Sequence, residues 1–127
     1  MKIVLDTHIL IHASTGKLTR ARIELLNDGR NILFFSSISL WEITKLYEHR
    51  RIRPEREIQA YLSQFTQHPK YTSVGLTPEV LACVLQVAPK LHKDPADQLI
   101  VATALTLSAK LMTDDQKIQD AGIVETV

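Results

Sequence analysis

The chain has 127 residues, of which 45% are apolar and 23% are charged. These values are typical of a globular protein, and the length suits one domain, residues 1–127, that can bury a core without disulfides. The formal net charge is only +1, so nucleic-acid binding would require a local basic surface rather than a basic chain.

The cysteine content and the apolar runs argue against two further classes of protein. Cys83 is the only cysteine, so a disulfide framework is excluded and a reducing cytoplasm is the expected location. No apolar run approaches the ~20 residues of a membrane span. Asp6 interrupts the first apolar run, which argues against a signal peptide. We therefore expect a cytoplasmic protein with no membrane association.

The first third of the chain alternates between strand and helix patterns. Residues 3–5 are a short apolar run that ends in a turn, which predicts a buried strand. Residues 8–13 predict a short helix, and residues 19–28 predict an amphipathic helix that Gly29 ends. A second buried strand is expected at residues 31–35.

The middle of the chain continues this alternation. Ser39 and Glu42 form a capping-box pattern that predicts the start of a helix. Pro54 separates this helix from another, which is predicted at residues 55–66. Residues 71–76 alternate like a third strand. Trp41, Phe34 and Phe35 are expected in the core.

The last third begins with a helix predicted from Thr77, followed by a loop at residues 88–93. Residues 110–113 predict a fourth strand, and residues 123–127 predict a short strand at the edge of the sheet. Short apolar strands that alternate with helices indicate a parallel sheet covered on both faces. The expected fold class is therefore α/β, with four to five short strands in a mostly parallel sheet.

The helix after residue 93 carries the most informative acids. Asp94 is expected as its N-cap, because proline fits the first helical position and Pro95 follows directly. Asp97 then falls at the third helical position, in line with the apolar stripe of Ile100, Val101 and Ala104. A carboxylate at the rim of a core needs hydrogen bonds, a cation or a metal.

Other acids follow the predicted strands. Asp6 ends the first strand, Glu42 lies one turn into the helix after the second, and Asp114 and Asp115 follow the fourth. Ligand sites of such folds lie at the carboxyl ends of the strands. Asp97 joins this edge if its helix begins there and runs antiparallel to the sheet.

Each acid also has a purely structural interpretation. Asp6 suits a cap of the following helix, Glu42 completes a capping box, and Thr113 with Gln116 suits a cap of the last helical turn. Taken together, however, several facing carboxylates repel one another and raise each other's pKa unless a divalent cation neutralises them. Oxygen ligands without thiolates indicate Mg²⁺ or Mn²⁺.

Histidines and basic residues give weaker signals. His8 and His12 are spaced like zinc ligands, but the segment between them lacks the glutamate of the metalloprotease helix. His92 is expected to order an acid or to contact substrate. Residues 45–56 carry a net charge of +3, which suits either a solvated helix end or a phosphate-backbone contact beside a metal pocket.

The ordered set of acidic segments resembles the PIN domain ribonucleases, specifically the VapC-type toxins of type II toxin–antitoxin pairs. The matching segments are Leu5–His8, Ser39–Glu42, His92–Ile100, Ala102–Ala104 and Leu111–Asp115. They occur in the family's order across nearly the whole chain. The resemblance implies a three-layer α/β/α sandwich.

The resemblance also implies the roles of individual residues. It assigns metal-site acids to Asp6, Glu42, Asp97 and Asp115. Asp115 is preferred to Asp114 because the third residue of the family's Thr-x-Asp pattern is the acid. Asp94, Thr7, Thr113 and Asp114 are expected to support the metal ligands or to position phosphate or substrate. Gln98 stands where the family usually has arginine.

The leading hypothesis is metal-assisted hydrolysis of RNA phosphodiester bonds, with homodimerisation and inhibition by a cognate VapB-type antitoxin implied by the resemblance. One alternative is a non-catalytic PIN-like module whose acidic pocket grips a basic partner protein. Another is phosphoryl transfer to Asp6, as in receiver or haloacid-dehalogenase-like folds, although the latter usually have an acid where this chain has His8.

Overall fold

The protein is built on a four-stranded, wholly parallel sheet, seen in a computed structural model that describes residues 1–127. The strands are β1 (Lys2–Leu5), β2 (Ile32–Ser36), β3 (Tyr71–Val74) and β4 (Lys110–Met112). Their order across the sheet is β3-β2-β1-β4. In the two pairings of β1, Val4 lies opposite Phe34 of β2 and Leu111 of β4.

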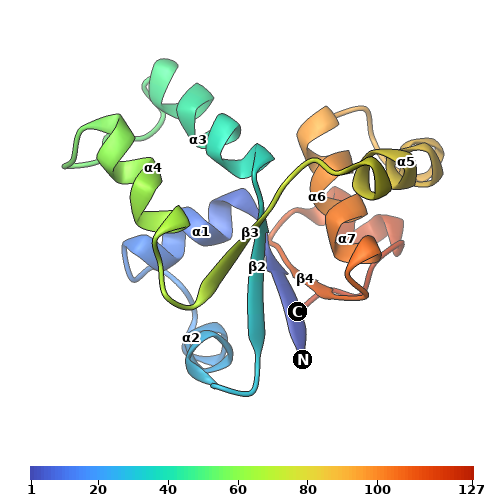
Figure 1. Cartoon of the computed structure of the whole chain (residues 1–127), viewed down its shortest axis with the longest axis horizontal. Coiled ribbons are helices and arrows are strands. Elements are labelled where there is room, and N and C mark those ends of the chain that lie inside the picture. The colour runs from blue at the N-terminus through green and yellow to red at the C-terminus, as the bar shows by residue number, and fades with distance from the viewer.

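Helices cover both faces of the sheet and make the molecule a three-layer α/β/α sandwich (Figure 1). One layer contains α1 (Thr7–Ser14), α2 (Arg20–Asn27), α3 (Ile38–Glu48) and α4 (Ile58–Thr66). The other contains α5 (Pro78–Val87), α6 (Pro95–Thr106) and α7 (Gln116–Ala121), with the short 3₁₀ turn η1 (Ala88–Lys90) between α5 and α6. None of these helices combines the length and the apolar character that a membrane crossing requires.

Alternation along the strands divides the core into two halves. Ile3 and Leu5 of β1 point to one face, where they pack with α1, α3 and α4. Val4 points to the opposite face, where it joins Ile100 and Val101 of α6. All of these side chains are completely buried. The position of β1 between two apolar layers explains why its sequence is a continuous apolar run.

The predicted fold class is confirmed, and each of the four principal strands begins and ends within two residues of its predicted bounds. The prediction of an edge strand at residues 123–127 is wrong in part. This segment makes a single parallel bridge, between Thr126 and Leu111, rather than a strand. The predicted helix at residues 55–66 begins only at Ile58, because the Glu57 side chain caps it by accepting from the N–H groups of Gln59 and Ala60.

Trp41 also differs from its expected place in the core, because 56% of its surface is exposed. Ser39 and Ile43 set the inward face of α3, and both are completely buried. Trp41 is two residues from each of them, which turns its side chain about 200° away at 100° per residue. Phe35 is completely buried, as predicted.

Ile100 tests the importance of the α6 face of the sheet. Ile100→Ala should lower the free energy of unfolding by about 2–5 kcal/mol, because it leaves a cavity in a completely buried position. Ile32→Ala, at a residue 52% exposed at the start of β2, should cost less than about 1 kcal/mol. Urea denaturation followed by circular dichroism measures both. Equal losses would contradict the assignment of α6 to the core.

Candidate functional site

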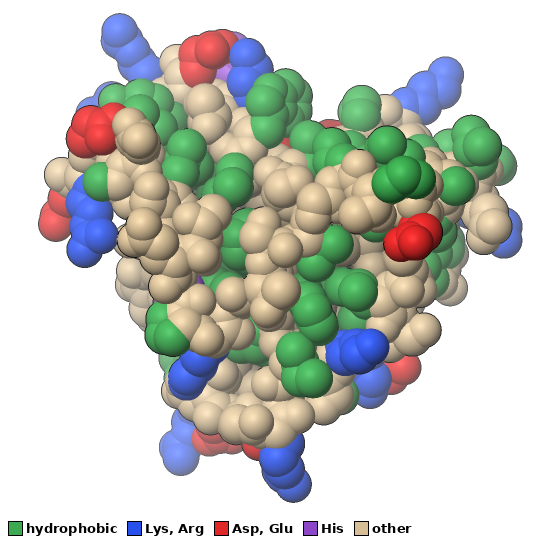
Figure 2. Space-filling model, viewed as in Figure 1, with side chains coloured by type: hydrophobic (Ala, Val, Ile, Leu, Met, Phe, Trp, Pro, Cys, Tyr) green, Lys and Arg blue, Asp and Glu red, His purple; other side chains and the backbone are tan.

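Four acids from separate segments meet at the carboxyl edge of the sheet. Asp6 follows β1, Glu42 lies on α3 after β2, Asp97 lies in the first turn of α6, and Asp115 follows β4. All four strands run upward in Figure 1, so this edge faces the space between α3 and α6. The space-filling surface is notched there, between the α3 side and the α5 side of the molecule (Figure 2).

Asp6 is the most buried of the four, with 6% of its surface exposed. Its Oδ1 accepts a hydrogen bond from the backbone N–H of Thr7 at 2.8 Å, so it caps α1 as the sequence suggests. Its Oδ2 accepts a bond from the Thr113 hydroxyl at 2.5 Å. Both oxygens are thus held by hydrogen bonds, one of them across 107 residues of sequence. This arrangement argues against Asp6 as a free nucleophile for phosphoryl transfer.

Glu42 is positioned by α1 rather than by its own helix. The Thr7 hydroxyl donates to Glu42 Oε1 and lies 2.9 Å from the hydroxyl of buried Ser39. The predicted capping box is therefore wrong, since α3 begins at Ile38 and the Ser37 side chain makes no capping bond. Ser39 and Glu42 are one turn apart on the same face, and that face meets Thr7 instead of the free N–H groups of α3.

Asp97 is held at the start of α6, where the local structure follows the prediction. Asp94 is the N-cap, accepting from the N–H groups of Ala96 at 2.9 Å and Asp97 at 3.2 Å. Asp97 Oδ2 lies 2.6 Å from His92 Nε2, and only 14% of the Asp97 side chain is exposed. Gln98 donates to the backbone oxygen of His92 at 3.1 Å. The histidine therefore orders the acid, one of its two expected roles.

Asp115 and Asp114 point to different surroundings. Asp115 caps α7 by accepting from the N–H of Ile118 at 3.0 Å, so the cap suggested for Thr113 and Gln116 is wrong. Thr113 instead joins two acids, donating to Asp6 and accepting from the N–H of Asp115 at 3.0 Å. Asp114 is exposed and forms an ion pair with Arg22. That pairing turns Asp114 away from the other acids.

The structure brings the acids into two overlapping groups that share Asp97. Carboxylate oxygens of Asp6, Glu42 and Asp97 lie within 4.8 Å of one another. The same limit joins Asp97 to Asp115 and to the imidazole of His92. No lysine or arginine forms an ion pair with any of the four acids. His92 beside Asp97 is the only basic side chain paired with the cluster, so the carboxyl groups of Asp6, Glu42 and Asp115 have no cationic side chain paired with them.

Burial and mutual repulsion raise the pKa values of three acids of this cluster. Burial raises the pKa of Glu42 from 4.5 to about 7, and the charges of Asp6 and Asp97 add to the shift while the Thr7 hydrogen bond opposes it. Burial is also the main cause that raises the pKa of Asp6 and of Asp97. The bonds from Thr113 to Asp6 and from His92 to Asp97 act in the opposite direction.

Two residues around the acids were not anticipated from the sequence. Ser39 was assigned to a cap, yet its buried hydroxyl supports Thr7. Arg22 lies on α2, where it pairs with Asp114 and donates to the backbone oxygen of Thr113 at 2.9 Å. Its position in an amphipathic helix pattern gave no signal of this contact. His92 Nδ1 is buried without a hydrogen-bond partner.

Carboxylate oxygens that converge in this way can bind a hard divalent cation. Mg²⁺ and Mn²⁺ prefer oxygen ligands, and a cation removes the repulsion among the ionised acids. The donor set consists of four carboxylates with one imidazole at its rim, and it contains no thiolate. The residues present therefore fit such an ion.

Comparisons with known proteins find relatives in sequence and in fold. Ribonuclease VapC22 of Mycobacterium tuberculosis is 29% identical over 119 residues, which cover 92% of this chain and 89% of that protein. DNA-bound VapBC from Salmonella typhimurium contains a chain with a TM-score of 0.76 at 17% identity, and the match covers 100% of this chain and 97% of that one. VapBC2 from Rickettsia felis, bound to a DNA fragment from its promoter, gives 0.74 at 20% identity, with 100% and 98% covered.

The family model described as "PIN domain" matches residues 3–124, which span all four strands and all four acids of the cluster. The α/β fold with a four-stranded parallel sheet is consistent with this match. The chain therefore belongs to the PIN domain family.

Proposed function

We propose that this protein is a metal-dependent endoribonuclease that acts as the toxin of a VapC-type toxin–antitoxin pair. The observation that carries the proposal is the convergence of Asp6, Glu42 and Asp97, whose carboxylate oxygens lie within 4.8 Å of one another although they come from three distant segments. Such a cluster is costly to the fold, and only Asp97 has a basic side chain, His92, paired with it. The similarity to Ribonuclease VapC22 supports RNA as the substrate.

We assign Asp6, Glu42, Asp97 and Asp115 as the residues that would hold Mg²⁺ or Mn²⁺. A bound ion of this kind lowers the pKa of water and stabilises the negative charge that develops on a phosphate during hydrolysis. Thr7 and Thr113 fix the orientation of the acids, because each donates its hydroxyl to a carboxylate. Asp94 supports Asp97 through the N-cap of α6, whereas Asp114 is expected to have no direct role.

Glu42 is the best candidate for the general base. A base works best when its pKa lies near the working pH, and burial places the pKa of Glu42 at about 7. It is also more accessible than Asp6, and the Thr7 hydroxyl holds only one of its oxygens. The other oxygen is then free to accept a proton from the attacking water.

We further propose that the protein forms a homodimer and is inhibited by a VapB-type antitoxin in the cytoplasm. Exposed apolar side chains support a protein interface on the α5 side of the molecule (Figure 2). Leu85 is 77% exposed and Leu81 is 48% exposed, both on α5. Contiguous exposed apolar surface, rather than a single exposed leucine, marks a protein–protein contact, and these two residues lie one turn apart on the same face of α5. The similar solved structures are VapBC assemblies, which supports an antitoxin as the second partner.

Asp115 and Asp114 offer a matched pair of variants that tests the metal site. Asp115→Asn should abolish measurable Mn²⁺ binding by calorimetry or weaken it by at least tenfold, and should lower the cleavage rate of RNA by about 10²–10³-fold. Asparagine caps a helix as well as aspartate, so the fold should be retained. Asp114→Asn breaks only the ion pair with Arg22 and should leave both measurements near wild type.

Equal effects of the two substitutions would contradict the assignment of Asp115. If wild-type protein binds no Mn²⁺ at millimolar concentration, the nuclease proposal fails. That outcome would favour the alternative of a non-catalytic module whose acids grip a basic partner.

The raised pKa of Glu42 predicts how pH affects the stability of the metal-free protein. Between pH 4.5 and about 7 the folded protein holds a proton on Glu42 that the unfolded chain has lost, so the free energy of unfolding should fall as pH rises through this range. Glu42→Gln has no titrating carboxyl at this position, so it should not show the part of the pH-dependent fall in stability that Glu42 causes. Relative to wild type, its melting temperature in EDTA should rise by about 2–5 °C across the same range.

The comparison with Glu42→Gln is needed because His68 acts in the opposite direction. Burial lowers the pKa of His68, so its contribution to stability increases with pH. Mn²⁺ should restore the stability of the wild type at the upper end of the range, since an ion that binds only the folded state stabilises it and requires ionised ligands. Parallel melting curves for the two proteins would contradict the raised pKa.

A further inference from the structure

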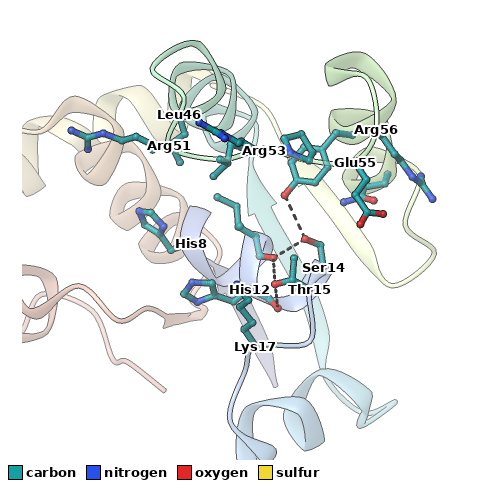
Figure 3. A pocket seen from close by; sticks show the side chains of 15 residues that line it. His8, His12, Ser14, Thr15, Lys17, Leu46, Arg51, Arg53, Glu55 and Arg56 are labelled. Atoms are coloured by element: carbon teal, nitrogen blue, oxygen red, sulfur yellow. Dashed lines mark hydrogen bonds between the residues drawn. The ribbon is translucent and has the colours of Figure 1, made fainter.

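A groove of about 870 Å³ lies beside the acidic cluster, between α1 and the segment that connects α3 to α4 (Figure 3). Its lining is rich in cations and imidazoles and contains one acid, Glu55. The basic lining residues are His8, His12, Lys17, Arg51, Arg53 and Arg56. Figure 3 shows Arg51 and Arg53 on one wall, with His8, His12 and Lys17 on the opposite wall.

The cations of this groove lack partners within the protein. Lys17, Arg51 and Arg53 form no ion pair, although Arg20, Arg22 and Arg30 elsewhere on the surface each pair with an acid. All three unpaired side chains belong to exposed residues. Like charges placed together around a groove repel one another, and an anionic ligand removes that repulsion. The groove is therefore built to receive negative charge.

Two helices, α1 and α3, contribute residues both to the groove and to the acidic cluster. On α1, Thr7 supports Glu42 and the next residue, His8, lines the groove. On α3, Glu42 belongs to the cluster and Leu46, one turn later, lines the groove. Four residues of a helix rise about 6 Å, so Leu46 at the groove lies about that far along α3 from Glu42. A chain of anionic groups can thus extend from the cluster into the groove.

We infer that this groove binds the phosphates of an RNA strand on one side of the bond that the acidic cluster cleaves. Guanidinium groups suit this role because they pair with phosphate oxygens through two parallel hydrogen bonds. The imidazoles of His8 and His12, whose ring centroids are 6.3 Å apart, offer surfaces on which bases can stack. The choice of RNA rests on the proposed nuclease function, whereas the anionic character of the ligand rests on the unpaired cations alone.

The test is the affinity for a short fluorescein-labelled single-stranded RNA, measured by anisotropy in EDTA so that no cleavage occurs. The double variant Arg51→Gln/Arg53→Gln should bind about tenfold more weakly and should reduce the slope of log K against log salt concentration by about 1.4. Lys17→Gln, on the opposite wall, should reduce the slope by about 0.7. With Mn²⁺, the double variant should raise KM and leave kcat unchanged, because it removes binding that is equal in ground and transition states.

The matched control is Arg30→Gln/Lys110→Gln, which removes the same charge from the opposite, amino-terminal edge of the sheet. Both of these residues already have acidic partners, Asp28 and Glu125. RNA affinity and salt slope for this control should remain at wild-type values. If the groove variants behave like the control, the inference is overturned.

The inference would also be overturned if the double variant lost binding to polyglutamate but bound RNA like the wild type. That result would favour an acidic protein segment as the ligand of the groove. The groove and the nuclease proposal fail separately. Wild-type protein that binds RNA through Arg51 and Arg53 but does not cleave it with Mn²⁺ keeps the groove and rejects the nuclease. If the wild-type protein cleaves RNA with Mn²⁺ and the double variant has the same KM as the wild type, the nuclease proposal stands and the groove is rejected.

Discussion

The constraint on which the structure depends is the presence of several carboxylates within a few ångströms at one edge of a parallel sheet. Burial opposes their ionisation, and each negative charge opposes the next. The fold holds them there because β1 and β4 are neighbours and α6 begins at the same edge. An arrangement that costs stability without a cation is understandable when a cation is part of the working protein.

The acids are oriented by the same hydrogen bonds that begin the helices. Asp6 and Asp115 each accept a backbone N–H of the helix that follows, and Asp94 does so for the helix that carries Asp97. The same hydrogen bonds therefore cap the helices and fix the positions of the acids. Thr7 and Thr113 then connect the helices, since their hydroxyls link Asp6 and Glu42 to segments far away in the sequence. A carboxylate that is already fixed loses little entropy when it binds an ion.

Charge in this protein is separated in space although it nearly cancels in sum. The net charge of +1 combines an acidic cluster that no lysine or arginine neutralises with a groove whose Arg51 and Arg53 have no acidic partner. The two regions share α1 and α3, so they meet within about one helical turn. Opposite charges placed side by side but left unpaired suit a ligand that carries both a metal-binding phosphate and further phosphates along a chain.

The sequence alone determined the layered α/β/α architecture, because short apolar runs separated by amphipathic segments leave few other folds, and it indicated the N-cap at Asp94 and the acids near the strand ends. It misassigned Ser39 and Glu42 to a local cap, since their spacing satisfies a capping box equally well. Only the tertiary structure decided that Thr7 lies against Glu42. It also decided that Asp114 pairs with Arg22 outside the cluster, and that Arg51 and Arg53 face α1. These contacts join residues far apart in the chain, and periodicity reports which face of an element is buried but not which distant side chain meets it.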